Sequence, residues 1–180
     1  MRVSCVAAFL FVLLPSVGST QSLPSSVSIQ AAAGPTVTDK GHHVSAAVGF
    51  SPLSRVTVLL DVQRTHLSSR ITRQERGFSA FRGGTMTAVS GEVRVGLWPV
   101  QRVTPYVLAG LGAGVSRPNV NETFPDPVTN DARFMFFGGG VHVPLRERLS
   151  VFGDARMLVG AEAGELLAMA PVRVGLAWRF

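Results

Sequence analysis

Acidic and basic side chains stand two positions apart in several stretches of small and apolar residues, and these pairs are the first candidates for chemistry. Glu92 and Arg94 form one pair and Asp154 and Arg156 another, and a spacing of two places both side chains on one face of a β-strand. Carboxylates and guanidinia can perform acid–base catalysis, but no spacing here marks a catalytic group, so an enzyme is not expected. Because unpaired buried charges are costly, the favoured interpretation is a structural ion network, with an ion- or proton-conducting path as the alternative. The expected members of the network are Asp61, Glu92, Arg94, Asp154, Arg156 and Arg173.

Histidines and a glycine run are the remaining candidates for a binding site. His42 and His43 follow Asp39 closely and are possible metal ligands, but a plain polar loop is the favoured interpretation. His142 is expected to be a hydrogen-bonded structural histidine. The run Gly110-x-Gly112-x-Gly114 is not a dinucleotide-binding loop, because the third glycine has the wrong spacing and no helix is predicted after it. No metal or other cofactor is therefore expected.

The composition indicates one ordered domain with an unusually low content of charge. Of the 180 residues, 46% are hydrophobic and 16% are charged, whereas about 25% charged residues is usual for a soluble protein. The net charge of +6 comes almost wholly from arginine, since Lys40 is the only lysine. A basic chain can bind nucleic acid or an acidic membrane surface. Nucleic-acid binding also needs stacking aromatics, and only Phe78 and Phe81 lie near the arginine-rich segment, so nucleic acid is not an expected partner.

Residues 1–22 have the features of a cleaved secretory signal peptide. Arg2 precedes the apolar run Val6–Leu14, and Pro15 and several small residues follow that run. The run is shorter than the roughly 20 residues of a transmembrane helix, although an uncleaved anchor is the alternative. Cys5 precedes the apolar run and should leave with the leader, so residues 23–180 would form a domain without cysteine.

Apolar residues in this domain alternate with small or polar ones, which predicts β-strands. Tight connections that carry proline alternate with longer polar segments, and this alternation is typical of a transmembrane barrel. The expected fold is therefore an all-β, eight-stranded, antiparallel, up-and-down transmembrane barrel. The eight predicted strands are Val27–Ala33, Val44–Phe50, Arg55–Gln63, Val89–Leu97, Val107–Ser116, Phe137–Val143, Leu149–Val159 and Val172–Phe180.

Alternation alone does not decide which face of the barrel meets water. A soluble barrel points its apolar face inward, whereas an outer-membrane barrel points it outward. The polar face here carries small residues and charges of both signs, as a narrow lumen requires, and the apolar face ends in Trp178 and Phe180, like the aromatic girdle at a membrane edge. These features favour the membrane barrel, with the six charged residues pointing into the lumen. The alternative is a soluble exported barrel, similar to a lipocalin, that binds a small apolar ligand.

Three segments resemble strands of the opacity-like and outer-membrane-protein-A-like eight-stranded barrels. Thr104–Gly114 contains the Pro-Tyr-x-x-x-Gly-x-Gly pattern of that family, and Gly138–Leu145 and Leu149–Arg156 are similar to the two strands that follow it. The resemblance implies a monomer in the outer membrane of a bacterium, exported through the cleaved leader and lacking the peptidoglycan-binding domain of some relatives. The end of the chain is similar to the signal read by the barrel assembly machinery, through Val172, Val174, Leu176, Trp178 and Phe180.

The long connections carry the residues that could meet partners outside the cell. Arginine binds phosphate in a bidentate manner, so lipopolysaccharide is an expected partner of the second long loop, with a plain solvated loop as the alternative. His66-Leu67-Ser68 resembles the His-x-Ser pair of outer-membrane lipid A deacylases, but the flanking residues do not match. The expected role is therefore structural or surface-interacting. No large pore is expected, because eight strands enclose only enough room for side chains. The loop arginines are Arg64, Arg70, Arg73, Arg76 and Arg82.

Overall fold

A computed structural model describes residues 26–37, 41–67, 71–75, 78–81, 83–100, 102–120, 129–162 and 165–180. Almost all of these residues lie in antiparallel strands. No helix within the described ranges is long and apolar enough to cross a membrane. The leader predicted at residues 1–22 lies outside the described residues and stays a prediction.

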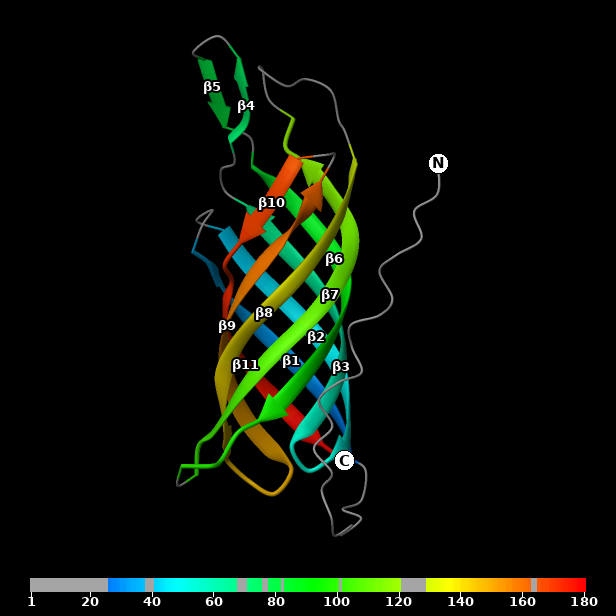
Figure 1. Ribbon diagram of the computed structural model, residues 1–180, viewed down its shortest axis with the longest axis vertical. Coiled ribbons are helices and arrows are strands. Elements are labelled where there is room, and N and C mark those ends of the chain that lie inside the picture. The colour runs from blue at the N-terminus through cyan, green and yellow to red at the C-terminus, as the bar shows by residue number, and fades with distance from the viewer. Residues whose placement is uncertain are drawn as a thin grey trace, which may run out of the picture.

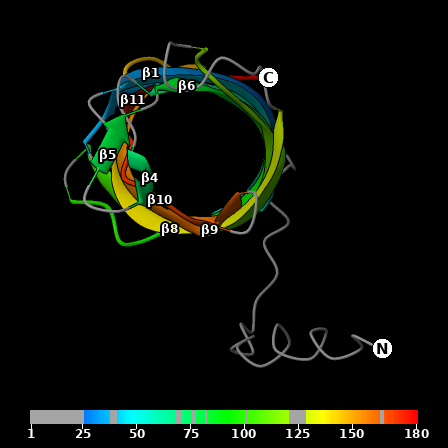
Figure 2. The same cartoon turned by 90° about the horizontal axis from the view of Figure 1, so that it is seen from above.

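Eight strands form the wall of a closed barrel (Figure 1). Neighbouring wall strands pair in antiparallel fashion, and β11 pairs back with the first strand, which closes the barrel (Figure 2). Among the described residues, β10 pairs only with β9. The predicted all-β, eight-stranded, antiparallel fold is confirmed. The wall strands are β1 (Ser26–Thr36), β2 (Gly41–Leu53), β3 (Val56–Leu67), β6 (Gly84–Gly96), β7 (Thr104–Pro118), β8 (Asn130–Pro144), β9 (Leu149–Glu162), and β10 (Glu165–Met169) continued by β11 (Val172–Arg179).

The eighth wall strand is interrupted at Pro171 but keeps its register. Met169 of β10 lies opposite Leu158 and Val172 of β11 lies opposite Ala155, so both segments pair with β9 in one line. A proline has no backbone N–H to donate to the ladder. The strand is predicted from Val172 onward, whereas the structure begins it at Glu165. The sequence of β10 has apolar residues on both faces, because the lumen is itself apolar here, and alternation is therefore lost.

Short turns and long connections lie at opposite ends of the barrel. The turn end is the end that holds residues 54–55, 97–100, 102–103 and 145–148, together with the first residue of β1 and the last of β11. The opposite end, the loop end, holds the connection between β3 and β6. Within this connection β4 (Ile71–Glu75) and β5 (Phe78–Phe81) form a separate two-stranded sheet beyond the wall (Figure 1), where a polar loop was expected. Strands of four and five residues are too short for alternation to reveal them.

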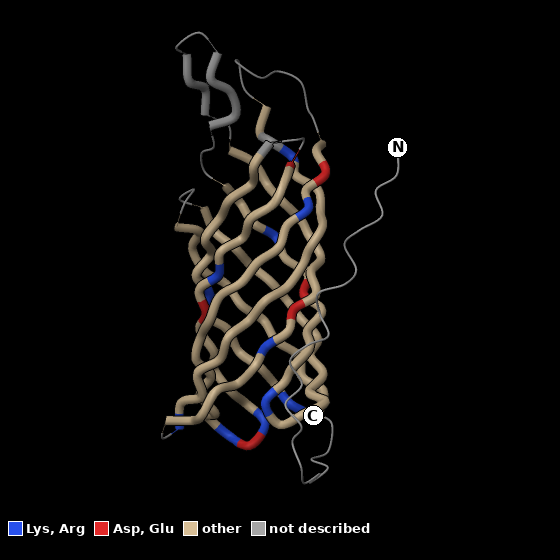
Figure 3. The backbone as a smooth tube through the Cα atoms, in the orientation of Figure 1, with Lys and Arg blue, Asp and Glu red and all other residues tan. Residues whose placement is uncertain are grey.

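The wall is apolar outside and charged inside. Outward-facing Leu111 is 67% exposed and Val174 is 63% exposed, whereas inward-facing Arg173 is 1% exposed and Glu92 is 2% exposed. Figure 3 shows how few charged positions interrupt the wall strands, and how several gather at the turn end. A soluble barrel has the inverse arrangement. The exposed apolar face requires lipid around it.

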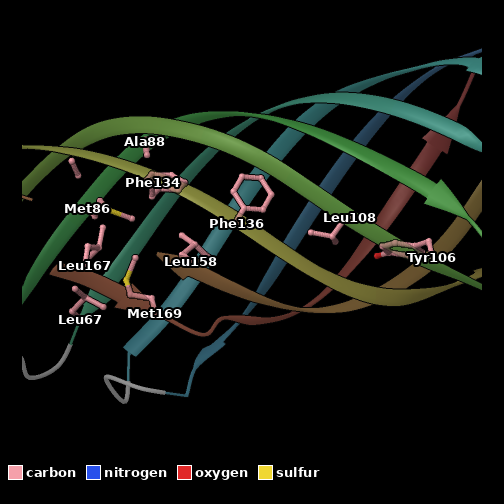
Figure 4. Close-up of a cluster of buried hydrophobic side chains, with 11 residues drawn as sticks. Leu67, Met86, Ala88, Tyr106, Leu108, Phe134, Phe136, Leu158, Leu167 and Met169 are labelled. Carbon is pink, nitrogen blue, oxygen red and sulfur yellow. The ribbon is translucent and has the colours of Figure 1, made fainter. Parts of the chain in front are cut away.

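Apolar side chains fill much of the lumen, and most of them lie toward the loop end; we call the group the apolar cluster (Figure 4). Phe134 and Phe136 of β8 lie opposite Gly112 and Gly110 of β7. A Cβ atom added at either glycine would meet the opposing ring, so the glycines make room for the two phenylalanines. Small residues and ions are expected throughout the lumen, and the structure adds this cluster. Its members are Leu67, Met86, Ala88, Tyr106, Leu108, Ala132, Phe134, Phe136, Leu158, Leu167 and Met169.

Candidate functional site

All six charged residues expected on one face lie together inside the barrel, and we call this group the ion network. Alternation along four wall strands points them inward: β3 supplies one, β6 and β9 supply two each, and β11 supplies one. Every member is buried. The three carboxylates and three guanidinia have no net formal charge when all are ionised. The members are Asp61, Glu92, Arg94, Asp154, Arg156 and Arg173.

Asp154 is the centre of the ion network. The Nε and Nη2 atoms of Arg173 donate to its two carboxylate oxygens, each at 2.9 Å. This bidentate geometry is the strongest form of a charged hydrogen bond between side chains. The Nε atom of Arg156 donates to Oδ1 of Asp154 at 3.0 Å, and the Tyr106 hydroxyl donates to Oδ2 at 3.0 Å. Asp154 thus holds two guanidinia and a phenol in place.

Glu92 and Asp61 extend the network across the lumen. Glu92 accepts hydrogen bonds from Nε of Arg94 at 2.6 Å and from Nη2 of Arg156 at 2.5 Å. Asp61 accepts one from Nη1 of Arg173 at 3.0 Å. The hydrogen bond from Arg156 of β9 to Glu92 of β6 joins strands that are not neighbours in the wall. The bond from Arg173 of β11 to Asp61 of β3 does the same. The pairs therefore act as struts across the barrel.

Polar and aromatic side chains surround the guanidinia. Gln30 accepts a hydrogen bond from Nη1 of Arg94 at 3.1 Å, and Ser45 accepts one from Nη1 of Arg173 at 3.0 Å. The Arg94 guanidinium also lies 4.8 Å from the ring centres of both Tyr106 and Phe152, a geometry that stabilises a desolvated cation.

Four neighbours of the ion network are not predicted from the sequence: Gln30, Ser45, Tyr106 and Phe152. The strand alternation places these four side chains on the inward face, and this was the signal in the sequence that could have identified them. Each carboxylate of the network accepts a hydrogen bond from at least one arginine. The arrangement therefore suits a mechanical role better than proton transfer.

The two adjacent histidines of β2 point to opposite faces and cannot share one metal ion. His43 faces inward, where its Nδ1 atom lies 2.9 Å from the Thr65 hydroxyl. His42 faces outward, and its ring centre lies 5.0 Å from that of His66. The described residues contain no group of three or more possible metal ligands. Asp39 lies outside the described residues.

The His-x-Ser pair and the loop arginines are described only in part. His66 packs against His42, while Ser68 lies outside the described residues. Arg64 is exposed on the outer face near the loop end, as are Arg117 and Arg133. The side chains of the other predicted loop arginines, Arg70, Arg73, Arg76 and Arg82, lie outside the described set.

The predicted assembly signal occupies the outer face of β11. Its five side chains all point away from the lumen and are exposed. The backbone N–H of Phe180 donates to the carbonyl of Val27 at 2.9 Å, so the end of the last strand is held against the first. The residues are Val172, Val174, Leu176, Trp178 and Phe180.

Comparison with known proteins identifies the fold. No family model matches the sequence, and no curated protein does. The N-terminal β-barrel domain of Pseudomonas aeruginosa OprF is similar, with a TM-score of 0.59 and 17% identity over 86% of this chain and 97% of that domain. Neisserial surface protein A gives a TM-score of 0.62 with 10% identity, over 87% of this chain and 96% of that protein. A major outer membrane protein of Thermus thermophilus gives a TM-score of 0.59 with 18% identity, over 87% of this chain and 99% of that protein.

These neighbours are eight-stranded outer-membrane barrels. At such low identity the likeness shows the fold alone, and it confirms the resemblance predicted from the strand motifs.

Proposed function

Because the chain has the fold of eight-stranded outer-membrane barrels, we propose that it is a small integral protein of the bacterial outer membrane with a structural or surface-interaction role. The observation that carries this proposal is the inverted polarity of the wall. Charged side chains such as Arg173 are buried in the lumen, while aliphatic ones such as Leu111 are exposed around it. The three structural neighbours are bacterial outer-membrane proteins, which supports the same location.

The proposed lumen is closed to large solutes. Eight strands leave an interior that side chains can fill. The ion network occupies it at one level and the apolar cluster occupies it toward the loop end. Arg156 reaches Glu92 from the far wall, so the network itself lies across the path. We infer that the barrel braces or presents surface loops and does not conduct metabolites.

Orientation follows from the lengths of the connections. Outer-membrane barrels place short turns in the periplasm and long loops outside, so the turn end would face the periplasm. Arg64, Arg117 and Arg133 would then lie near the outer leaflet, where lipopolysaccharide phosphates are the matching partners. The barrel assembly machinery would read the outer face of β11, and the closed wall needs no partner copy, which supports a monomer.

Fractionation and conductance measurements test this proposal. We expect the protein in the outer-membrane fraction, soluble only in detergent, and with heat-dependent migration on gels. In a planar bilayer we expect no stable porin-sized steps. The charge-neutral double variant Glu92→Ala/Arg156→Ala removes one strut and should raise small-ion conductance, whereas Leu60→Ala on the outer face should not. Release without detergent, or porin-sized conductance of the unaltered protein, would refute the proposal.

A further inference from the structure

A cavity of about 140 Å³, lined by both polar and apolar groups, lies in the lumen between the ion network and the turn end. We call it the turn-end vestibule. Residues from β1, β2, β3, β6, β7, β8, β9 and β11 contribute to its lining. Its ionisable lining residues are Arg55, Arg94, Arg179, Tyr106 and His142, and among the described residues that line it there is neither Asp nor Glu.

The vestibule has a surplus of positive charge. Arg94 forms its inner end, and that guanidinium is already paired with Glu92 on the side of the ion network. Arg55 and Arg179 lie among the short turns of the turn end and are not part of the network. The network has no net formal charge, so these two guanidinia supply the excess positive charge of the lining. Positive potential in a cleft with low-dielectric walls concentrates anions.

Both arginines lie near the mouth, and the contacts described for them there do not use their guanidinium N–H donors. The Arg55 guanidinium lies over the Trp98 ring, 5.3 Å from its centre, and a ring face takes up none of its N–H donors. The backbone N–H of Arg179 donates to the carbonyl of Arg148 at 2.8 Å, which fixes the start of that side chain. The lining also includes the hydroxyl groups of Ser28 and Thr104. Phosphate oxygens accept hydrogen bonds from guanidinium groups, often in a bidentate manner, and from hydroxyl groups.

The size of the vestibule matches a single phosphate group. A cavity of about 150 Å³ holds a benzene ring of six heavy atoms, and a phosphate has five. We propose that the turn-end vestibule binds a phosphate group, carried by a phospholipid headgroup or by free phosphate. The binding site goes beyond the proposed function. Only its opening toward the periplasm rests on the proposed orientation.

The exposed turns around the mouth of the vestibule also carry positive charge. Arg102, Arg146 and Arg148 are exposed at the turn end, against the single acidic residue Glu147 between two of them (Figure 3). These side chains do not line the vestibule. They would attract a phosphate toward the mouth but would not hold it inside. This distinction between lining and flanking arginines gives the experiment its control.

Phosphate titration of the refolded full barrel in zwitterionic detergent tests the proposal. The probe is inorganic phosphate, and the readout is the emission of Trp98, measured in a Trp178→Phe background so that Trp98 is the only tryptophan. Sodium chloride at equal ionic strength corrects for screening. We expect a saturable change with phosphate. Arg179→Ala should weaken the apparent affinity about tenfold, since a lost charge-assisted hydrogen bond has that effect. Arg146→Ala should leave it within about twofold, because a flanking charge acts only by steering.

Two further measurements make the outcome decisive. Arg55→Ala should weaken phosphate binding in the same direction as Arg179→Ala. For this variant, heat-dependent gel migration establishes folding, and binding is followed by the ³¹P NMR line width of phosphate in place of Trp98 emission. Short-chain phosphatidic acid added to the phosphate complex identifies the source: competition assigns the site to lipid phosphate, and absence of competition assigns it to free phosphate. A response to phosphate no larger than that to chloride would overturn the proposal. Equal losses in Arg179→Ala and Arg146→Ala would overturn it as well.

Discussion

Removal of the Glu92 carboxylate should destabilise the barrel far more than removal of an exposed carboxylate. Glu92 accepts hydrogen bonds from Arg94 at 2.6 Å and from Arg156 at 2.5 Å. In Glu92→Ala the ion network would keep three guanidinia against two carboxylates. Arg156 would retain Asp154 at 3.0 Å, and the next nearest acidic contact of Arg94 would be Asp154 at 3.7 Å. One positive charge would then remain uncompensated in the lumen.

The magnitude follows from the burial of the pair. Breaking a buried ion pair by removal of one partner lowers the free energy of unfolding by about 3–5 kcal/mol, because the other charge is stranded. Glu92 is 2% exposed, so solvent screens little of this effect. Glu147 is exposed in the turn between β8 and β9, and Glu147→Ala should stay within about 0.5 kcal/mol of the unaltered protein. The double variant Glu92→Ala/Arg94→Ala leaves two charges of each sign and should recover part of the loss, with a coupling of about 0.5–3 kcal/mol.

Urea unfolding in phospholipid vesicles measures these differences. Unfolding is followed by tryptophan emission and by gel migration of the unheated protein, at several urea concentrations approached from both directions. We expect the order unaltered protein, Glu147→Ala, double variant, Glu92→Ala, from most to least stable. Equal midpoints for Glu92→Ala and Glu147→Ala would refute the role of Glu92 as a buried strut. A double variant less stable than Glu92→Ala alone would refute the charge argument.

Three further predictions concern packing, orientation and assembly. Gly112→Val should destabilise the barrel by about 1–3 kcal/mol in the same urea assay, because the new side chain meets the Phe134 ring; Gly91→Ala, where an added Cβ meets no atom within 4 Å, is the control. Cysteine in place of Val120 should react with an impermeant maleimide on intact cells and cysteine in place of Val100 should not, and the reverse pattern would invert the proposed orientation. Deletion of Phe180 should leave the protein able to fold in detergent but poorly inserted in cells, with periplasmic degradation products on immunoblots; normal surface levels at native expression would contradict its role as an assembly signal.

Alternation along the chain was sufficient to identify most of the wall. A spacing of two residues fixes which side chains share a face, so Glu92 and Arg94 could be assigned to one side without knowledge of any neighbour. The same rule put Trp178 and Phe180 on the opposite, apolar side. It failed at β10, where both faces are apolar, and at the short hairpin of β4 and β5. Local pattern therefore predicts a strand only when its two faces meet different surroundings.

Contacts between distant strands depended on closure of the barrel. Arg173 reaches Asp61 across the lumen over 112 positions of sequence, and the register that brings them together is set by the pairing of every strand between β11 and β3. The packing of Phe134 against Gly112 depends in the same way on the register of β7 and β8. A shift of one residue in such a register would move each side chain to the other face. Local sequence specifies a residue's own face, but the partner across the lumen is specified only when all the strands close together, since closure fixes tilt and stagger at once.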